Sequence, residues 1–160
     1  MSYNWRIISW KRCLALSIGV LLVLIIVNFY GLYTNKFYFF KVDNYIFPLL
    51  AIVHFSYLQA MHLKINNKIF SDPQLRNLEY ALYAILLVYI FKATDTAYIL
   101  LSYSEFETYF MPETFIPVGL GIFSFQVLLI ILTIISFRYR RQLVGKYNFD
   151  HINDKLDSWQ

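Results

Sequence analysis

The chain has 160 residues, of which 59% are hydrophobic and 15% are charged, and its formal net charge is +4. Its mean hydropathy of +0.50 lies far above that of an ordinary soluble domain, and its length allows one bundle of helices without a second folded domain. The single cysteine, Cys13, excludes an internal disulfide, paired-cysteine redox chemistry and a four-cysteine metal site.

Long apolar runs account for most of the sequence. They occupy residues 13–33, 45–63, 78–103 and 115–137. A helix needs about 20 apolar residues to cross a hydrocarbon core of about 30 Å, and only a helix satisfies its own backbone polar groups in lipid. The sequence therefore predicts an all-α fold, a four-transmembrane-helix bundle within one membrane domain that covers residues 1–160. With their flanking residues, we expect these helices at about 13–34, 45–64, 73–103 and 115–141.

The loop after the first helix contains consecutive aromatic residues at positions 37–40, between two lysines. Aromatic rings favour the layer between lipid headgroups and tails over free water. We therefore expect this stretch to lie on the outer headgroup layer or to cover the mouth of the bundle.

The sequence Ser71-Asp72-Pro73 predicts the start of the third helix, because it offers a capping side chain followed by proline at the first helical position. A helix from there to residue 103 would be about 45 Å long, which exceeds the hydrocarbon core by roughly two or three turns. The excess, which includes Arg76 and Glu79, is expected to project into the cytoplasm.

Residues 148–160 follow the last apolar run and have an amphipathic pattern. Apolar residues recur there at helical spacing, with aspartates among them: Phe149, Ile152, Leu156 and Trp159. This pattern predicts a short amphipathic helix. Two interpretations stay open: the helix lies on the lipid surface or against the second loop, or its apolar residues form a docking site for a partner protein.

The distribution of lysine and arginine predicts the orientation of the helices. Basic residues lie in the N-terminal segment, the first and second loops and the tail, whereas the third loop carries only Glu105, Glu107 and Glu113. An even number of crossings puts both termini on one side of the membrane, and the positive-inside rule places that side in the cytoplasm. We therefore expect a multi-pass membrane protein whose N- and C-termini lie in the cytoplasm.

Polar residues within the apolar runs are the candidate site: His54 in the second helix, Lys92 and Asp95 in the third, and Gln126 in the fourth. Counted from the helix ends, they all lie near mid-membrane, where they could form one buried polar layer. An ionisable residue inside a span is costly, so by default it has a partner or a function. The layer could be structural, with Lys92 and Asp95 neutralising each other. It could instead be a proton or cation relay or a polar ligand site, or the charged pair could face the lipid.

Motifs that would indicate an enzyme are absent from the sequence. The histidines His54, His62 and His151 form no HExxH or i, i+4 ligand pair, and there is no glycine-rich phosphate loop or nucleophile elbow. We therefore expect no catalytic residue, no cofactor, no metal site and no nucleic-acid partner. The expected partners are the lipid bilayer, a membrane or cytoplasmic protein, and further copies of the chain in a homo-oligomer.

Short motifs at the helix ends carry a resemblance to a known family. Tyr45 and Pro48 open the second helix, Phe70-Ser71 precedes the third, and the last span ends in Phe137-Arg138. These motifs resemble a bacterial family of small four-helix integral membrane proteins of unknown function, in which a G-x-x-L motif often follows the fourth helix. This chain has Tyr139-Arg140-Arg141-Gln142-Leu143 there, without the glycine.

The resemblance implies the four-helix fold and a membrane location, which we expect to be a bacterial cytoplasmic (inner) membrane, and it supplies no catalytic residues. Because some family members are encoded beside small helix-turn-helix regulators, it also implies a regulatory partner at the membrane.

These features favour a small integral membrane protein that acts as an interaction or regulatory partner through its cytoplasmic face. That face would consist of the second loop, the projecting start of the third helix and the tail. The alternative is an oligomeric ion channel or an ion-coupled transporter that uses the mid-membrane polar layer.

Overall fold

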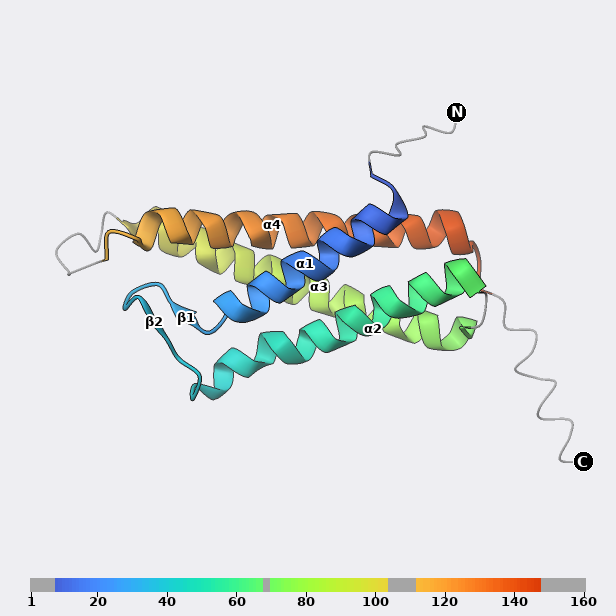
Figure 1. Ribbon diagram of the computed structural model, residues 1–160, viewed down its shortest axis with the longest axis horizontal. Helices are drawn as coiled ribbons and strands as arrows, with labels where there is room; N and C mark the ends of the chain where they lie inside the picture. Colours follow the sequence, from blue (N-terminus) through green and yellow to red (C-terminus); the bar gives the residue numbers. More distant parts are fainter. Residues whose placement is uncertain (1–7, 68–69, 104–111, 148–160) are drawn as a thin grey trace, which may run out of the picture.

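A computed structural model describes residues 8–67, 70–103 and 112–147, which form a helical bundle (Figure 1). Its long helices are α1 (Trp10–Val27), α2 (Ile46–Asn67), α3 (Asp72–Leu101) and α4 (Phe115–Tyr139). Each of the four is long and apolar enough to cross a membrane. The structure therefore confirms the all-α class, while the amphipathic helix expected at 148–160 lies outside the described residues.

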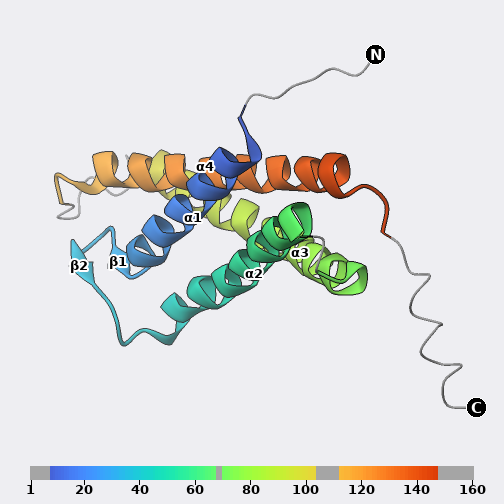
Figure 2. The same cartoon turned by 45° about the vertical axis from the view of Figure 1, so that its right-hand side comes forward.

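Consecutive helices run in opposite directions along the long axis of the molecule (Figure 1). α4 packs against α3 and α1, and α2 packs against α3 and α1. α1 lies obliquely across α4, as the turned view also shows (Figure 2).

Hydropathy predicts a first helix at 13–34, but α1 begins three residues earlier and ends seven residues earlier. Its N-terminus extends to Trp10, which is buried and meets Tyr139 of α4 edge to face, with ring centroids 5.8 Å apart. The exposed Lys11 and Arg12 stand between Trp10 and the apolar run, so hydropathy alone places the start of the helix too late.

A two-stranded hairpin, β1 (Tyr30–Gly31) and β2 (Lys36–Phe37), follows α1. Tyr30 pairs with Phe37 across the antiparallel strands. Asn35 makes the turn in left-handed backbone (φ 53°), a conformation that asparagine adopts more readily than most residues. The sequence prediction extended the helix through this hairpin because its residues are apolar or aromatic, and hydropathy does not distinguish the two structures.

The aromatic stretch at 37–40 packs partly against itself and partly against residues that flank it. Phe39 lies against Phe29 (ring centroids 5.5 Å apart) and stacks on Phe37 (5.8 Å). Phe29 also meets Tyr45 edge to face at 5.1 Å. The rings therefore build the surface of the bundle at the hairpin.

The other helices lie close to the ranges that hydropathy predicts, and their ends have local causes. A 3-10 turn, η1 (Val42–Tyr45), leads into α2. α3 has Pro73 in its first turn, as expected, although Ser71 makes no side-chain capping hydrogen bond. α4 continues into one turn of π-helix, η3 (Arg140–Val144), and Gly145 then ends it with a positive φ of 80°, a conformation that favours glycine.

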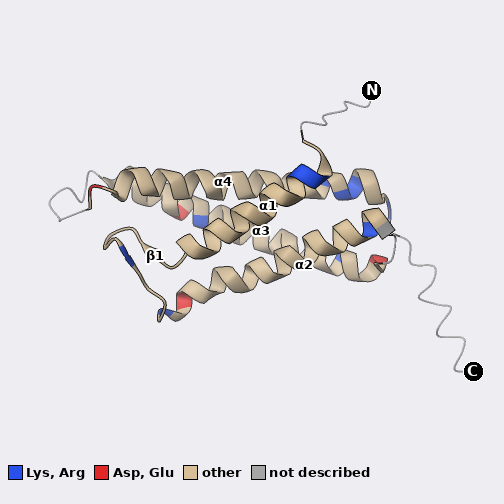
Figure 3. Cartoon of the chain, in the orientation of Figure 1, with Lys and Arg blue, Asp and Glu red and all other residues tan. Residues whose placement is uncertain are grey.

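The bundle has two chemically different ends (Figure 3). We call the end with the β1–β2 hairpin the hairpin end. The opposite end, where α2 connects to α3 and α4 finishes, is called the basic end. The described Lys and Arg residues of the N-terminal part of α1 and of the segment that closes α4 lie toward it: Lys11, Arg12, Arg138, Arg140 and Arg141.

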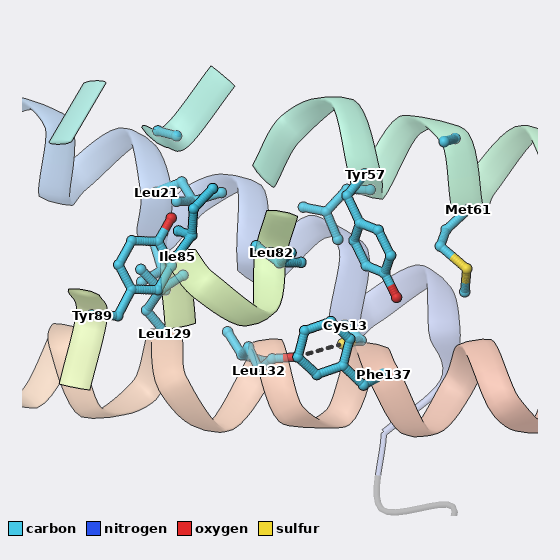
Figure 4. Packing of buried hydrophobic residues seen from close by; sticks show 14 of the residues in the cluster. Cys13, Leu21, Tyr57, Met61, Leu82, Ile85, Tyr89, Leu129, Leu132 and Phe137 are labelled. Carbon is cyan, nitrogen blue, oxygen red and sulfur yellow. Dashed lines mark hydrogen bonds between the residues drawn. The ribbon is translucent and has the colours of Figure 1, made fainter. Parts of the chain in front are cut away.

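The apolar core draws side chains from α1, α2, α3 and α4 (Figure 4). Leu21 of α1, Leu82 of α3 and Leu132 of α4 are buried there. By contrast, only 22% to 39% of the apolar window of each span is buried inside the bundle, and large apolar side chains such as Leu87 are exposed on the outside. An outer surface this apolar is unfavourable in water and suits contact with lipid.

Candidate functional site

Polar side chains gather at two levels of the bundle. Toward the hairpin end, a group that we call the cavity cluster lines a small cavity: Asn28, Tyr89, Lys92 and Gln126. At the basic end, a group that we call the Glu79 cluster joins α3 to the segment after α4: Glu79, Tyr83, Arg140 and Tyr147.

The cavity cluster contains a lysine whose hydrogen-bond partner lies outside its own helix, at the end of α1. Lys92 Nζ of α3 donates a hydrogen bond of 3.1 Å to Oδ1 of Asn28, the residue that follows α1. The Asn28 side chain in turn donates to the backbone oxygen of Asn44. This chain of contacts ties the middle of α3 to the end of α1 and to the loop that leads into α2.

The cavity itself has a volume of about 50 Å³. That is room for about one or two water molecules, since a water occupies about 30 Å³ in the liquid and needs two or more polar neighbours. Gln126 of α4 contributes to the wall, and its buried Oε1 has no hydrogen-bond partner among the described residues. The cavity therefore combines one cationic donor with one unsatisfied acceptor.

His54 of α2 joins this group through Tyr89. The imidazole is fully buried, and its Nδ1 lies 3.3 Å from the Tyr89 hydroxyl, with the two rings stacked at 5.9 Å. His54 Nε2 has no hydrogen-bond partner among the described residues. The structure thus brings three of the predicted layer residues, His54, Lys92 and Gln126, around Tyr89.

Asp95 does not join them, and its expected place in a buried layer is wrong. Its side chain is exposed, and Lys92–Asp95 is not among the described ion pairs whose nitrogen and oxygen lie within 4.0 Å of each other. Residues three apart on a helix differ by about 60° in direction, so they share a face without having to touch. Lys92 turns toward Asn28 of the neighbouring segment, and Asp95 lies on the outer side of α3.

Apolar side chains separate the cavity cluster from the basic end. Along α3, Leu82 and Ile85 are buried between Tyr89 and Glu79. Along α4, Leu132 is buried in the same core. The buried hydroxyls of Ser17, Thr133 and Ser136 donate to backbone oxygens of their own helices, so these hydrogen bonds do not join the two polar groups.

The Glu79 cluster is the more complete of the two polar groups. Glu79 is only 1% exposed, and its Oε1 accepts hydrogen bonds from Arg140 Nη2 (2.8 Å), Arg140 Nε (3.0 Å) and the Tyr83 hydroxyl (3.1 Å). The Tyr147 hydroxyl donates to Oε2. Both carboxylate oxygens are thus satisfied by donors, two of them from a guanidinium, which makes these bonds stronger than neutral ones.

Arg140 also fixes the backbone that follows α4. Its Nη1 donates to the Gly145 oxygen at 3.1 Å, and its guanidinium carbon lies 4.7 Å from the centre of the Tyr147 ring. Burial raises the pKa of Tyr147, and the hydrogen bond and negative charge of Glu79 raise it further, so the hydroxyl keeps its proton and remains a donor. The result is a rigid joint between α3 and the segment that leads out of the bundle.

A second ion pair secures the connection between α2 and α3. Lys64 Nζ lies 2.6 Å from Asp72 Oδ1 and donates at 2.9 Å to the Phe70 oxygen. Both charged side chains are mostly buried. This pair and the Glu79 cluster lie at the same end of the bundle.

Sequence reasoning placed Glu79 in the part of the third helix that projects beyond the hydrocarbon core, and it did not identify this carboxylate as buried against Arg140. A usable signal was present, because Leu75, Glu79, Leu82 and Ile85 follow the spacing of one helix face. A carboxylate on an apolar face needs a cation from a neighbouring element. The partner, Arg140, lies 61 residues away, and only the packing of α4 against α3 identifies it.

The remaining predicted site residues, Phe149, Ile152, Leu156 and Trp159, lie outside the described residues. Among the ranges that the structure describes, no group of three or more His, Cys, Asp or Glu side chains could hold a metal ion. Comparisons with protein-family models, with curated proteins and with solved structures gave no match. The resemblance to small four-helix membrane proteins of unknown function therefore stays a prediction.

Proposed function

We propose that this protein is a small integral membrane protein that binds a protein partner through its basic end and regulates it or is regulated by it. The observation that carries the proposal is the Glu79 cluster. In this cluster a buried carboxylate, two tyrosines and an arginine hold the segment after α4 against α3. Such a joint gives the exposed residues around it, Arg138 and Arg141, a defined position, which a binding surface needs.

We further propose that the basic end faces the cytoplasm of a bacterium and that the membrane is the inner one. The support is the concentration of lysine and arginine near this end, since the positive-inside rule concerns residues close to the ends of spans. At the hairpin end, Lys36 and Lys41 are accompanied by Asp43 and Glu113.

The alternative of an ion channel or an ion-coupled transporter has less support. It depends on Lys92, His54 and Gln126, which surround a cavity of only about 50 Å³. Leu82 and Leu132 fill the core between that cavity and the basic end. Liposomes that contain the purified protein should show no ion flux, and a flux that Lys92→Met abolishes would overturn the binding role in favour of transport.

Site-specific photo-crosslinking in the native membrane tests the binding role. A photoreactive amino acid is placed at Arg141, which is exposed at the basic end, and in a control variant at Phe37, which is exposed at the hairpin end. We expect one protein to be crosslinked from position 141 and not from position 37. We also expect the adduct to weaken in a Glu79→Gln background, in which the joint loses its charged partner. The same adducts from both positions, or no adduct from position 141, would contradict the proposal.

A further inference from the structure

A hollow of about 550 Å³ lies on the surface of the basic end, between the first turns of α3 and the segment after α4. Its lining is mostly cationic and aromatic: Arg76 and Tyr80 from α3, Arg140 and Arg141 from η3, and Lys146 and Tyr147 beyond Gly145. The cavity cluster lies in the opposite half of the bundle, so this hollow is a separate feature.

The hollow is strongly positive. None of the described residues that line it is acidic, and four of them are Lys or Arg. The nearby carboxylate of Glu79 is buried and engaged by Arg140, Tyr83 and Tyr147, so its charge is matched by Arg140. Arg141 and Lys146, which also line the hollow, are exposed.

The hollow also lies level with the ends of two apolar helices, α3 and α4. It is formed where two apolar spans end, since Arg76 is in the second turn of α3 and Arg141 follows the last residue of α4 by two positions. An amphipathic side chain in its lining remains open to the surroundings, since Tyr80 is 62% exposed. Cationic groups beside an exposed amphipathic ring match the boundary between lipid headgroups and acyl chains.

We propose that this hollow binds the phosphate headgroup of an anionic phospholipid. Guanidinium groups form paired hydrogen bonds with phosphate oxygens, and an ammonium adds a point charge, so Arg141 and Lys146 supply both kinds of contact. Tyr80, which also lines the hollow, offers an amphipathic ring to the glycerol and the upper acyl chains of the lipid. This role goes beyond the binding of a protein partner and does not depend on one.

Native mass spectrometry of the purified full-length protein tests the lipid site. The protein in a neutral detergent is titrated with phosphatidylglycerol and, in parallel, with phosphatidylcholine. We expect one molecule of phosphatidylglycerol to bind more tightly than phosphatidylcholine. In the double variant Arg141→Gln with Lys146→Gln, its affinity should fall at least about tenfold, since each basic residue near an anionic lipid contributes roughly a fivefold effect.

A matched double variant, Arg12→Gln with Arg138→Gln, removes the same charge from exposed positions that do not line the hollow. We expect it to change the affinity for phosphatidylglycerol by less than about twofold. Circular dichroism of both double variants confirms that the helices are retained. Equal losses in the two variants would overturn the proposal, because they would show only a diffuse attraction between charges.

Two further arms identify the source of the phosphate. Glycerol phosphate, the headgroup without acyl chains, should bind far more weakly than phosphatidylglycerol, and equal binding would overturn the lipid site in favour of a soluble phosphate ligand. Removal of residues 148–160 should leave the lipid affinity unchanged. Lipid binding that appears only after this removal would also overturn the proposal, because it would make the chain's own aspartate-containing tail the occupant.

Discussion

The two polar groups of this bundle accommodate a charged side chain in different ways, one around the buried Glu79 and one around the partly buried Lys92. In the Glu79 cluster, a carboxylate that is 1% exposed receives hydrogen bonds from Arg140, Tyr83 and Tyr147. In the cavity cluster, Lys92 has Asn28 as its acceptor and sits beside a cavity and the unsatisfied Gln126 oxygen. A fully satisfied polar network fixes one geometry, whereas a partly satisfied one leaves room for water or rearrangement. The first group therefore serves as a joint, and the second is the softer part of the core.

The largest expected effect comes from breaking the joint. Arg140→Met leaves Glu79 buried without its cation, and we expect a loss of about 3–5 kcal/mol in the free energy of unfolding. Denaturation in mixed micelles followed by circular dichroism measures it. Arg138→Met, which removes an exposed cation one position before the end of α4, should stay within about 0.5 kcal/mol of the wild type. Similar losses in the two variants would show that Glu79 and Arg140 do not depend on each other.

The same test applied to the cavity cluster should give a smaller effect. Asn28→Leu removes the acceptor of Lys92, and a lost hydrogen bond to a charged group costs about 1.5–3 kcal/mol. Water in the cavity can replace part of that bond, so we expect the lower end of the range. Adding Lys92→Met to Asn28→Leu should restore the part of the stability that the unpaired lysine costs, while the loss of the bond from Asn28 to the Asn44 oxygen remains in both variants. A double variant less stable than the single one would contradict this account of the cluster.

Tyr147→Phe sharpens the comparison through pH. The variant keeps the ring over Arg140 and loses the hydroxyl that donates to Glu79, so we expect a loss of about 1.5 kcal/mol at neutral pH. The pKa of Tyr147 is raised from 10.0 in the folded protein, mainly by burial, so the unfolded state releases this proton first as pH rises. The stability difference between wild type and variant should be constant below pH 10.0 and shrink above it. Unfolding free energies measured on both sides of that pH check the sign, and a difference that grows at high pH would contradict it.

The smallest effect is expected at Asp95. Its side chain is exposed, and the ion pairs of 4.0 Å or less among the described residues do not include Lys92–Asp95. We therefore expect Asp95→Asn to change the free energy of unfolding by less than about 0.5 kcal/mol. Folded yield in the membrane and stability in micelles measure it. A large loss would show that Asp95 has a partner in an assembly of several chains.

The parts of the fold that depend on local composition were predictable from the sequence. Runs of about 20 apolar residues identified the four long apolar helices, and Pro73 marked the start of α3. The hairpin at Tyr30–Gly31 was missed, since aromatic residues suit both a helix end and a strand, and hydropathy is blind to the difference.

The candidate site was less predictable, because it depends on which helix faces which. The depth estimate placed His54, Lys92 and Gln126 at one level because rise per residue is fixed by helix geometry, and the structure has His54 against Tyr89, which lines a cavity with Lys92 and Gln126. It did not predict that Lys92 forms a hydrogen bond with Asn28, which is 64 residues away in the sequence, and no ion pair with Asp95, which is three residues away. Glu79 and Arg140 were missed for the same reason, as their contact exists only after α3 and α4 pack together.

Cys13 has a practical consequence. It is the only thiol in the sequence, it is fully buried, and its sulfur lies 4.0 Å from the Leu132 oxygen at the crossing of α1 and α4. A membrane-permeant alkylating reagent can reach it only when that crossing separates. The rate of thiol modification in intact cells therefore reports how often α1 detaches from the bundle, without any label engineered into the protein.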